Sequence, residues 1–401
     1  MSDEPLLIVA NRIGLHGETG VQHHCQMILR HAPAWGKRVF FISPWERPRF
    51  SRRLVKLMSM AVAPVRPDLP FFFGQWAFDR ILRYRAVGLL RRFGSDRAVL
   101  YAQDPSTATA LLQLRRRWPS VRVVLCAHYA VSESSEHIER GLAEPGDKRT
   151  QRLDFVEGEA LLRCDAVIFP SEFSRQMAIS RVGLGDSNQL HVVPHVVEGD
   201  ENATSDRASS QLVSNRPDNG CLEDELRRPH LITIGTLEPR KNQAFLIRLV
   251  AELIRHGFDA HLTLVGDGPS RQELARLANE LNVSSRIHFA GLVLPAAPLI
   301  KDHVMLVHSS RMESFGIVLV EALSRGRPIG APPVGAIPEI IRDGIEGVHL
   351  DLDDIGQSAL LLAELFADAE RYRRMCAAAL ERYYDAFRPD KVLPRWRDAI
   401  G

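Results

Sequence analysis

The chain alternates between short, fully apolar runs and longer segments with helical periodicity. Leu6–Ala10 is apolar throughout, and a loop punctuated by glycines separates it from Val21–His31, which is predicted to be a helix. A strand buried on both faces of a parallel sheet shows no apolar–polar alternation, which is the pattern of the first run. The chain is therefore predicted to open with a parallel strand, a loop and a helix.

The same order recurs through the first half of the chain. Helices are predicted at Ser106–Arg117 and Asp154–Arg163, among others. Further strands are predicted at Arg38–Ile42, Val99–Tyr101, Val121–Cys126, Ala166–Phe169 and Leu190–Val193. Strands that alternate with helices in this way predict a parallel α/β sheet.

The segment Glu198–Pro229 interrupts this order, because it is polar and almost empty of large apolar residues. We interpret it as a linker between domains or an insertion. Beyond it the alternation resumes, with predicted strands at His230–Ile234, Leu262–Val265, Ile287–Phe289, Val304–Val307 and Pro328–Ala331. Helices are predicted at Asn242–His256, at Arg271–Leu281 behind a capping box of Ser270 and Glu273, and at Phe315–Ser324.

The pattern therefore predicts two Rossmann-like α/β domains. We place the first at residues 1–197, the linker at 198–229 and the second at 230–385. The aromatic-rich helix near Tyr372–Phe387 is expected to pack against a domain, and residues 386–401 are expected to return to the first domain.

Composition narrows the class of protein. The 401 residues are 45% hydrophobic and 25% charged, which is typical of a globular chain, and the formal net charge of +2 disfavours a nucleic-acid binder. The five cysteines are scattered without a C-x-x-C pair, which indicates neither a disulfide framework nor a zinc site. The N-terminus is acidic where a signal peptide is basic, and no apolar stretch has the length of a membrane span. We therefore expect a cytoplasmic protein.

Candidate chemistry is concentrated at strand ends of the second half. The segment Glu313–Glu321 follows a predicted strand, and its Ser-Phe-Gly turn enters a helix, where free N–H groups attract phosphate. Two carboxylates placed this way can bind hydroxyl groups at the two ends of one elongated ligand. The alternative is that Glu313 is solvated and that Glu321 lies on a helix surface.

Two further loops follow strands in the same half. The segment Gly235–Asn242 carries the cations Arg240 and Lys241 where a helix begins; cations are unfavourable there unless an anion such as a diphosphate binds. The alternative is a basic helix start on the surface. The loop at Gly266 is, taken alone, only a tight turn.

In these motifs the sequence resembles the retaining glycosyltransferases of family 4, which have the GT-B fold. The resemblance extends from Leu6 to about Phe387 and is most specific in five segments that occur in the family's order: GTLEPRKN, LVGDGP, IHFAGLV, ESFGIVLVEALSRGRP and VGAIPEII. It implies an α/β GT-B architecture, in which two Rossmann-like domains face a deep cleft. It also implies a metal-independent hexosyltransferase with a nucleotide-diphosphate sugar as co-substrate and no cofactor.

The resemblance assigns roles to individual residues of the second half. Glu313 would contact hydroxyls of the transferred sugar, Glu321 the ribose and Lys241 the diphosphate. The family's arginine usually follows the strand-end glycine, where this chain has Thr236, so Arg240 is a candidate replacement. The full set of expected donor-binding residues is Gly235, Thr236, Arg240, Lys241, Gly266, Leu292, Glu313, Ser314, Phe315, Gly316, Leu319 and Glu321.

The first half supplies fewer candidates. His128 ends an apolar run and matches the family's histidine that faces the donor sugar; together with Glu313 and Lys241 it completes the expected catalytic set. The glycine-containing loop and the start of the next helix match the family's acceptor-side loop, which implies acceptor contacts from Gly17, Gly20, Val21 and His24. The alternative is that His24 simply lies on that helix. No metal ligand is expected.

A basic, aromatic stretch spans residues 47–97. The stretch contains twelve lysines and arginines but only three aspartates. Its aromatic residues include Phe71, Phe72, Phe73, Trp76 and Phe78. Such composition suits the anionic inner face of the cytoplasmic membrane and an acceptor such as a polyprenyl-linked saccharide. The alternative is a helix with a buried aromatic stripe.

Several functions remain open at this level. The favoured hypothesis is a transferase for cell-surface polysaccharide biosynthesis, with GDP-mannose as a candidate donor. The alternatives are a transferase of the same fold that makes a small soluble glycoconjugate, a catalytically silent nucleotide-sugar-binding protein, and an epimerase or phosphorylase.

Overall fold

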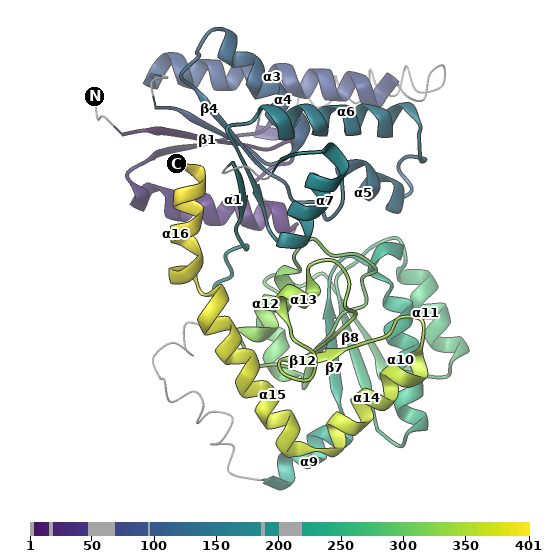
Figure 1. Ribbon diagram of the computed structural model, residues 1–401. Coiled ribbons are helices and arrows are strands. Elements are labelled where there is room, and N and C mark those ends of the chain that lie inside the picture. Colours follow the sequence, from purple (N-terminus) through teal and green to yellow (C-terminus); the bar gives the residue numbers. More distant parts are fainter. Residues whose placement is uncertain (1–3, 16–18, 47–68, 95–96, 186–188, 200–218) are drawn as a thin grey trace. The chain divides into compact units, whose positions relative to one another are not determined.

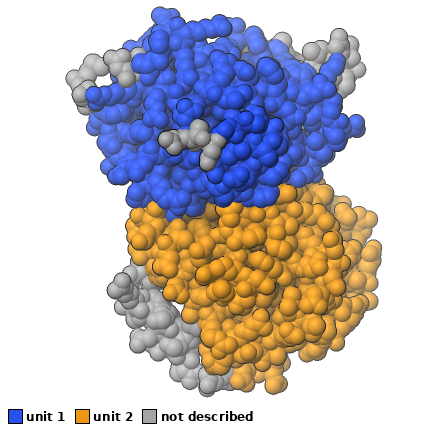
Figure 2. Space-filling model, viewed as in Figure 1, with its two compact units in different colours: residues 1–196, 392–401 blue, residues 197–391 orange. Residues whose placement is uncertain are grey.

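The computed structural model describes residues 4–401 except 16–18, 47–68, 95–96, 186–188 and 200–218. It divides into two compact units, Met1–Val196 with Val392–Gly401 and Val197–Lys391 (Figure 2). Each unit is built on one six-stranded parallel sheet. The α/β prediction is confirmed in both units.

The sheet of unit 1 has the strand order β2-β1-β3-β4-β5-β6. Its strands are β1 (Leu6–Ala10), β2 (Arg38–Ile42), β3 (Val99–Ala102), β4 (Arg122–Cys126), β5 (Ala166–Phe169) and β6 (Leu190–Val192). The prediction from uninterrupted apolar runs is confirmed for all six strands to within one residue at each end, because both faces of this sheet are covered.

Helices cover the two faces of this sheet separately (Figure 1). One face packs against α3 (Leu69–Phe93), α4 (Pro105–Leu112), α6 (Lys148–Arg163) and α7 (Glu172–Val182). The other packs against α1 (Gly20–His31) and α16 (Pro389–Ile400), so the last helix of the chain lies on unit 1. Trp396 of α16 is fully buried, and its indole N–H donates to the carbonyl of Pro194 at 2.7 Å.

The sheet of unit 2 has the order β12-β11-β10-β7-β8-β9. Its strands are β7 (His230–Ile234), β8 (His261–Val265), β9 (Ile287–Gly291), β10 (Met305–Val307), β11 (Ile329–Ala331) and β12 (Gly347–His349). Five of them were predicted, whereas β12 was missed, because it has three residues and begins with a glycine. In this order the sheet grows in opposite directions from β7 and β10, which is where ligands bind open α/β sheets.

The helices of unit 2 are α9 (Asn219–Arg227), α10 (Gln243–Arg255), α11 (Arg271–Glu280), α12 (Ile317–Leu323), α13 (Ile337–Ile340), α14 (Ile355–Ala367) and α15 (Ala369–Arg382). Helix α9 lies inside the predicted linker 198–229, and its Leu226 is buried in the core of unit 2. The polar composition of that helix concealed its single apolar face. Residues 200–218 of the predicted linker lie outside the described residues.

Local capping fixes where several helices begin. Thr19 and Gln22 form a reciprocal capping box at α1, and Ser132 and Asp147 cap α5 (Glu133–Glu139) and α6. The predicted capping box of Ser270 is wrong, because that residue has helical backbone angles and its side chain makes no capping hydrogen bond.

None of the helices in the described part of the chain combines the length and apolarity that a bilayer span requires.

Candidate functional site

Loops at the carboxyl edge of the second sheet form the candidate site. They follow β7, β8, β10 and β11, four adjacent strands that include the β7–β10 pair. The backbones of these loops pack closely: a Cβ atom at Gly266 would lie 2.1 Å from the carbonyl oxygen of Gly235, and one at Gly335 would lie 2.2 Å from that of Glu313. Glycine is therefore required where the loops touch.

Glu313 lies at the centre of this edge. Its Oε2 accepts hydrogen bonds from Nζ of Lys241 at 2.8 Å and from Nε2 of His308 at 3.2 Å. Lys241 comes from the loop after β7, whereas His308 and Glu313 come from the segment after β10. The three side chains therefore meet across the point where the strand order reverses.

The polar network around these residues holds Lys241 in place. Ser309 donates its hydroxyl to the backbone carbonyls of Lys241 at 2.8 Å and of Asn242 at 3.0 Å. Asn242 itself has left-handed backbone angles, with φ of 52°, and ends the turn that precedes α10. The loop that carries the lysine is thus bound to the loop that carries the glutamate.

Charge and burial oppose each other at Glu313. Burial alone would raise the pKa of its carboxyl group, but the Lys241 ammonium and the hydrogen bond from His308 hold the pKa well below its usual range. Burial lowers the pKa of His308, so its imidazole is neutral at pH 7 and donates through Nε2. The site therefore presents a carboxylate between a cation and a neutral donor.

Sequence reasoning missed His308. It is 3% exposed and directly follows β10, so a histidine at the carboxyl end of a predicted strand was the available signal. Arg311 also lies close by, with its backbone N–H bonded to the carbonyl of Arg240 at 3.3 Å, and its side chain is exposed.

The predicted replacement cation, Arg240, is held by a neighbour. Its guanidinium lies 3.2 Å from the carboxylate of Glu238, and both side chains are mostly buried. Thr236 is exposed at the start of the same loop, and Gln243 donates to its carbonyl at 2.9 Å. Arg240 therefore lies beside the Lys241–Glu313 pair, with part of its charge neutralised.

The second predicted carboxylate, Glu321, lies on α12. Partial burial raises the pKa of its side chain to about 7, although Arg325 opposes the shift. The turn before this helix is tight, since Gly316 has φ of 85° and a Cβ there would lie 2.9 Å from Leu319 Cδ1.

The remaining predicted donor-site residues fall into two groups. Ser314 is half-buried and Leu292 is 58% exposed, so both side chains reach the surface. Phe315 and Leu319, in contrast, are buried in the hydrophobic core of unit 2. Their side chains support the turn from beneath, which the sequence motif alone could not distinguish from ligand contact.

In unit 1, the predicted residue His128 follows β4 and is half-buried. Its Nε2 lies 2.9 Å from Oε1 of Gln103, and burial lowers the pKa of the imidazole to about 3. His24 is 1% exposed and is bonded through Nε2 to the hydroxyl of Tyr101 at 2.8 Å. His195, which sequence reasoning did not select, bonds His24 between the two Nδ1 atoms at 3.3 Å.

The other predicted acceptor residues lie at the start of α1. Gly20 is its first residue and is exposed, and Val21 is half-buried against the core of unit 1. Gly17 lies outside the described residues.

The basic, aromatic stretch is described only from residue 69 onward, where α3 carries it. Trp76 and Tyr84 are 53% and 68% exposed, whereas Phe71, Phe72, Phe73 and Phe78 are half-buried. Arg80 stacks over Trp76 with its guanidinium carbon 5.2 Å from the ring centroid. Residues 47–68 of the stretch lie outside the described residues.

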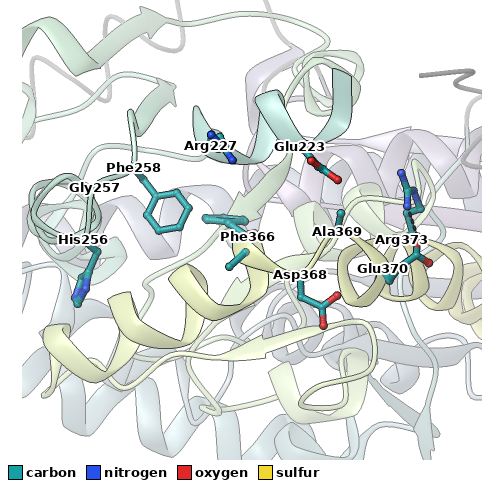
Figure 3. A pocket seen from close by; sticks show the side chains of 11 residues that line it. Glu223, Arg227, His256, Gly257, Phe258, Phe366, Asp368, Ala369, Glu370 and Arg373 are labelled. Carbon is teal, nitrogen blue, oxygen red and sulfur yellow. Dashed lines mark hydrogen bonds and ion pairs between the residues drawn. The ribbon is translucent and has the colours of Figure 1, made fainter. Parts of the chain in front are cut away.

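A separate pocket of about 730 Å³ lies in unit 2 (Figure 3). Its walls come from α9, from the turn before β8 and from the junction of α14 and α15, with Phe258 and Phe366 edge to face at 6.0 Å. Two of its walls, α9 and the turn before β8, directly precede β7 and β8, so the pocket lies at the amino edge of the sheet, away from Glu313. Arg373 is paired with Glu370, and Asp368 caps α15.

We expect Gly335→Ala to destabilise unit 2 and to displace the Glu313 loop. Gly335 has φ of 58°, so alanine adds left-handed strain of about 1–2 kcal/mol and the clash with Glu313 adds about 1–3 kcal/mol. Urea unfolding measures the loss. Gly344→Ala is the matched control, because Gly344 has φ of 74° but nothing within 4 Å of its added Cβ. Equal losses for the two variants would contradict the close packing.

Two family models match the chain and divide it between the halves. The model described as Glycosyltransferase Family 4 matches residues 19–201, and the model described as Glycosyl transferases group 1 matches residues 228–368.

Similar proteins agree with these models. The chain is 32% identical over 166 residues to N-acetyl-alpha-D-glucosaminyl L-malate synthase of Bacillus anthracis, covering 41% of this chain and 43% of that protein. It is 32% identical over 223 residues to the GDP-mannose-dependent alpha-(1-6)-phosphatidylinositol monomannoside mannosyltransferase of Mycolicibacterium smegmatis, covering 53% and 56%. The chain thus spans about half the length of these curated relatives.

Among solved structures, Anabaena HepE in complex with UDP and glucose has the same fold. The superposition has a TM-score of 0.68 at 15% sequence identity and covers 99% of both chains.

Proposed function

Because the chain belongs to family 4 of the glycosyltransferases, with the GT-B fold, we propose that it is a retaining hexosyltransferase. It moves a hexose from a nucleotide-diphosphate sugar to a saccharide or lipid-linked saccharide. The observation that carries this proposal is the bonded group of Lys241, Glu313 and His308 at the strand-order reversal of the second sheet.

The charges of this group suit the proposed reaction. When the bond between the sugar and the diphosphate breaks, negative charge accumulates on the leaving phosphate, and the Lys241 ammonium stabilises it. Glu313 accepts hydrogen bonds from sugar hydroxyls and positions the ring. The acceptor oxygen bonds to the anomeric carbon on the face that the diphosphate leaves, and its proton passes to the departing phosphate. This route needs no metal ion.

Glu321 and His128 receive supporting roles. Glu321 binds hydroxyls of the ribose as a hydrogen-bond acceptor. His128, which burial keeps neutral, hydrogen-bonds the transferred sugar. Gly235, Gly266 and Gly316 have no side chain, so the donor can approach the backbone of these loops closely.

For the donor we propose GDP-mannose. The mycobacterial relative with the longer matched segment is named as a GDP-mannose-dependent enzyme, which supports this choice. A turnover assay tests it: the chain is incubated with GDP-mannose and with saccharide or polyprenyl-linked acceptors, and NMR detects released GDP and the anomeric configuration of the product. A product with the donor's configuration is expected. An inverted product contradicts retention, and a donor that binds but is never consumed supports a silent binding protein.

We expect donor affinity to depend on the protonation of Glu321. Ribose hydroxyls donate to the carboxylate, so binding favours the ionised form and affinity rises with pH until it passes the pKa of about 7. Between pH 6 and pH 8 the Kd of a nucleotide sugar should fall about tenfold. Calorimetric titration measures it, and Glu321→Gln should remove most of the slope. A slope unchanged in that variant would contradict the role.

We also propose that the acceptor is lipid-linked and reached at the anionic inner face of the cytoplasmic membrane. The exposed Trp76 and the arginines of α3 support this. Flotation with vesicles containing anionic lipid should recover the chain, and Trp76→Ser with Arg80→Ser should weaken recovery. Recovery equal to that with neutral vesicles would favour a small soluble acceptor.

A further inference from the structure

Three potential metal ligands from distant parts of the sequence group inside unit 1, and a fourth side chain bonds one of them. They are His24 of α1, Cys126 at the end of β4, His128 two residues later, and His195 after β6. We propose that these four side chains bind one zinc ion through Nδ1 of each histidine and Sγ of Cys126.

The distances are close to those of a tetrahedral site. Ligand atoms of His24, Cys126 and His128 all lie within 4.8 Å of one another. The Nδ1 atoms of His24 and His195 are 3.3 Å apart, and Sγ of Cys126 is 4.0 Å from Nδ1 of His128. Zinc bonds of about 2.0–2.3 Å place neighbouring ligand atoms roughly 3.3–3.6 Å apart. Side-chain shifts of roughly 1 Å bring these pairs to the spacing of zinc ligands.

Hydrogen bonds at the far side of two rings orient them for this task. Nε2 of His128 is bonded to the amide oxygen of Gln103 at 2.9 Å, so this nitrogen carries the proton and Nδ1 offers its lone pair. Nε2 of His24 is bonded to the hydroxyl of Tyr101 at 2.8 Å. Metal-binding histidines in proteins almost always have such an outer partner. Both partners come from the neighbouring β3 segment.

The chemistry of the ligands selects the ion. One thiol and three imidazoles suit zinc, whereas magnesium and calcium prefer carboxylate and carbonyl oxygen. Cys126 and His128 are two residues apart at a strand end and so point to the same face of the sheet. The rings of His128 and His195 stack 5.2 Å apart, and Trp396 lies 4.4 Å from His24 between ring centroids. His24, Cys126 and His195 are buried and His128 is half-buried, so most of the site is shielded from water.

The protons balance when zinc binds. The thiol of Cys126 releases its proton to solvent. His24 keeps its proton at Nε2, and the proton on Nδ1 of His195 moves to Nε2 of the same ring, which frees both Nδ1 atoms for the ion. The bound group then carries one net positive charge. The ion connects α1, β4 and the segment that follows β6, and it fixes the ring of His128. His128 takes part in both proposals: with Nδ1 on the ion, its Nε2–H leaves Gln103 and donates to the transferred sugar. The two proposals therefore share this residue, and the metal assays test the inference without any turnover.

The test uses the full chain, freed of metal with a chelator and then titrated with zinc chloride or cobalt chloride. We expect one zinc per chain by elemental analysis and a raised Tm. Bound Co²⁺ should show a thiolate charge-transfer band and the strong visible bands of tetrahedral coordination. Cys126→Ser should lose the charge-transfer band, whereas Cys164→Ser, which changes another buried cysteine of unit 1, should keep it.

The cobalt spectrum of the unmodified chain tests whether the cluster binds metal, even where a variant fails to fold. Absence of stoichiometric zinc, or a cobalt spectrum without the thiolate band, would overturn the proposal and leave a hydrogen-bonded histidine cluster. Retention of the band in a folded Cys126→Ser chain would overturn it as well, as would its loss in Cys164→Ser alone.

Discussion

Replacing Glu313 with glutamine is expected to lower kcat for sugar transfer by at least about 100-fold, the usual effect of removing one preorganised electrostatic group from an active site. The Kd for the nucleoside diphosphate should change by less than about threefold, because Glu313 is proposed to bind the sugar and not the nucleotide. Steady-state kinetics and calorimetry on the same preparations separate the two quantities.

The control for Glu313→Gln is Glu346→Gln. Glu346 is likewise a buried glutamate of unit 2 with a cationic partner, here Arg342, but it precedes β12 at the amino edge of the sheet. The Glu346→Gln variant should be less stable than the unmodified chain, but each folded molecule should keep most of its turnover. An equal loss of turnover and of nucleotide affinity in Glu313→Gln would contradict the assigned role.

The second large effect is expected for Lys241→Ala. A hydrogen bond to a charged group contributes about 1.5–3 kcal/mol, so the Kd for a nucleoside diphosphate should rise about 10- to 150-fold. Removing the ammonium also raises the pKa of Glu313, because Lys241 is the main opposite charge beside it. Binding measured by calorimetry at low salt tests the first effect.

Lys301→Ala provides the matched control, because Lys301 is an exposed lysine of the same unit. The Lys301→Ala variant should bind the nucleoside diphosphate with the same Kd as the unmodified chain. If Lys241→Ala binds the nucleotide as tightly as Lys301→Ala does, the ammonium is not the diphosphate contact.

Strand positions could be predicted well because burial on both faces leaves uninterrupted apolar runs. Leu6–Ala10 and His230–Ile234 were predicted to the residue. Helix α9 and strand β12 were missed, since a helix with one apolar side and a three-residue strand carry too few apolar positions to be recognised. The order of strands within each sheet followed from no local pattern.

The second-half site was partly predictable because its residues lie at strand ends within recognisable motifs. The pairing of Lys241 with Glu313 was not, since 72 positions separate them in the sequence. His308 was missed for a related reason. Its role comes from its hydrogen bond to Glu313, and the sequence does not show that contact. For Phe315 and Leu319 the motif was misleading in the other direction. Their positions in it suggested ligand contact, but their side chains are buried in the core.

The histidine cluster of unit 1 was invisible in the sequence. Cysteine spacing argued against a zinc site, and that argument considered only local ligands. His24 and His195 lie 171 positions apart, and they meet because α1 and the segment after β6 pack on the same face of the first sheet.

The central claim is that unit 2 binds a nucleotide-diphosphate sugar at Lys241 and Glu313. Thermal unfolding of the full chain with UDP, GDP, ADP and their sugars tests it most directly, with Lys241→Ala beside it. A donor at 100 times its Kd should add about 2.7 kcal/mol of stability, visible as a raised Tm. At the same concentration the stabilisation of Lys241→Ala should fall to about 0.3–1.4 kcal/mol. If no nucleotide or nucleotide sugar shifts the transition of the unmodified chain, the claim is contradicted.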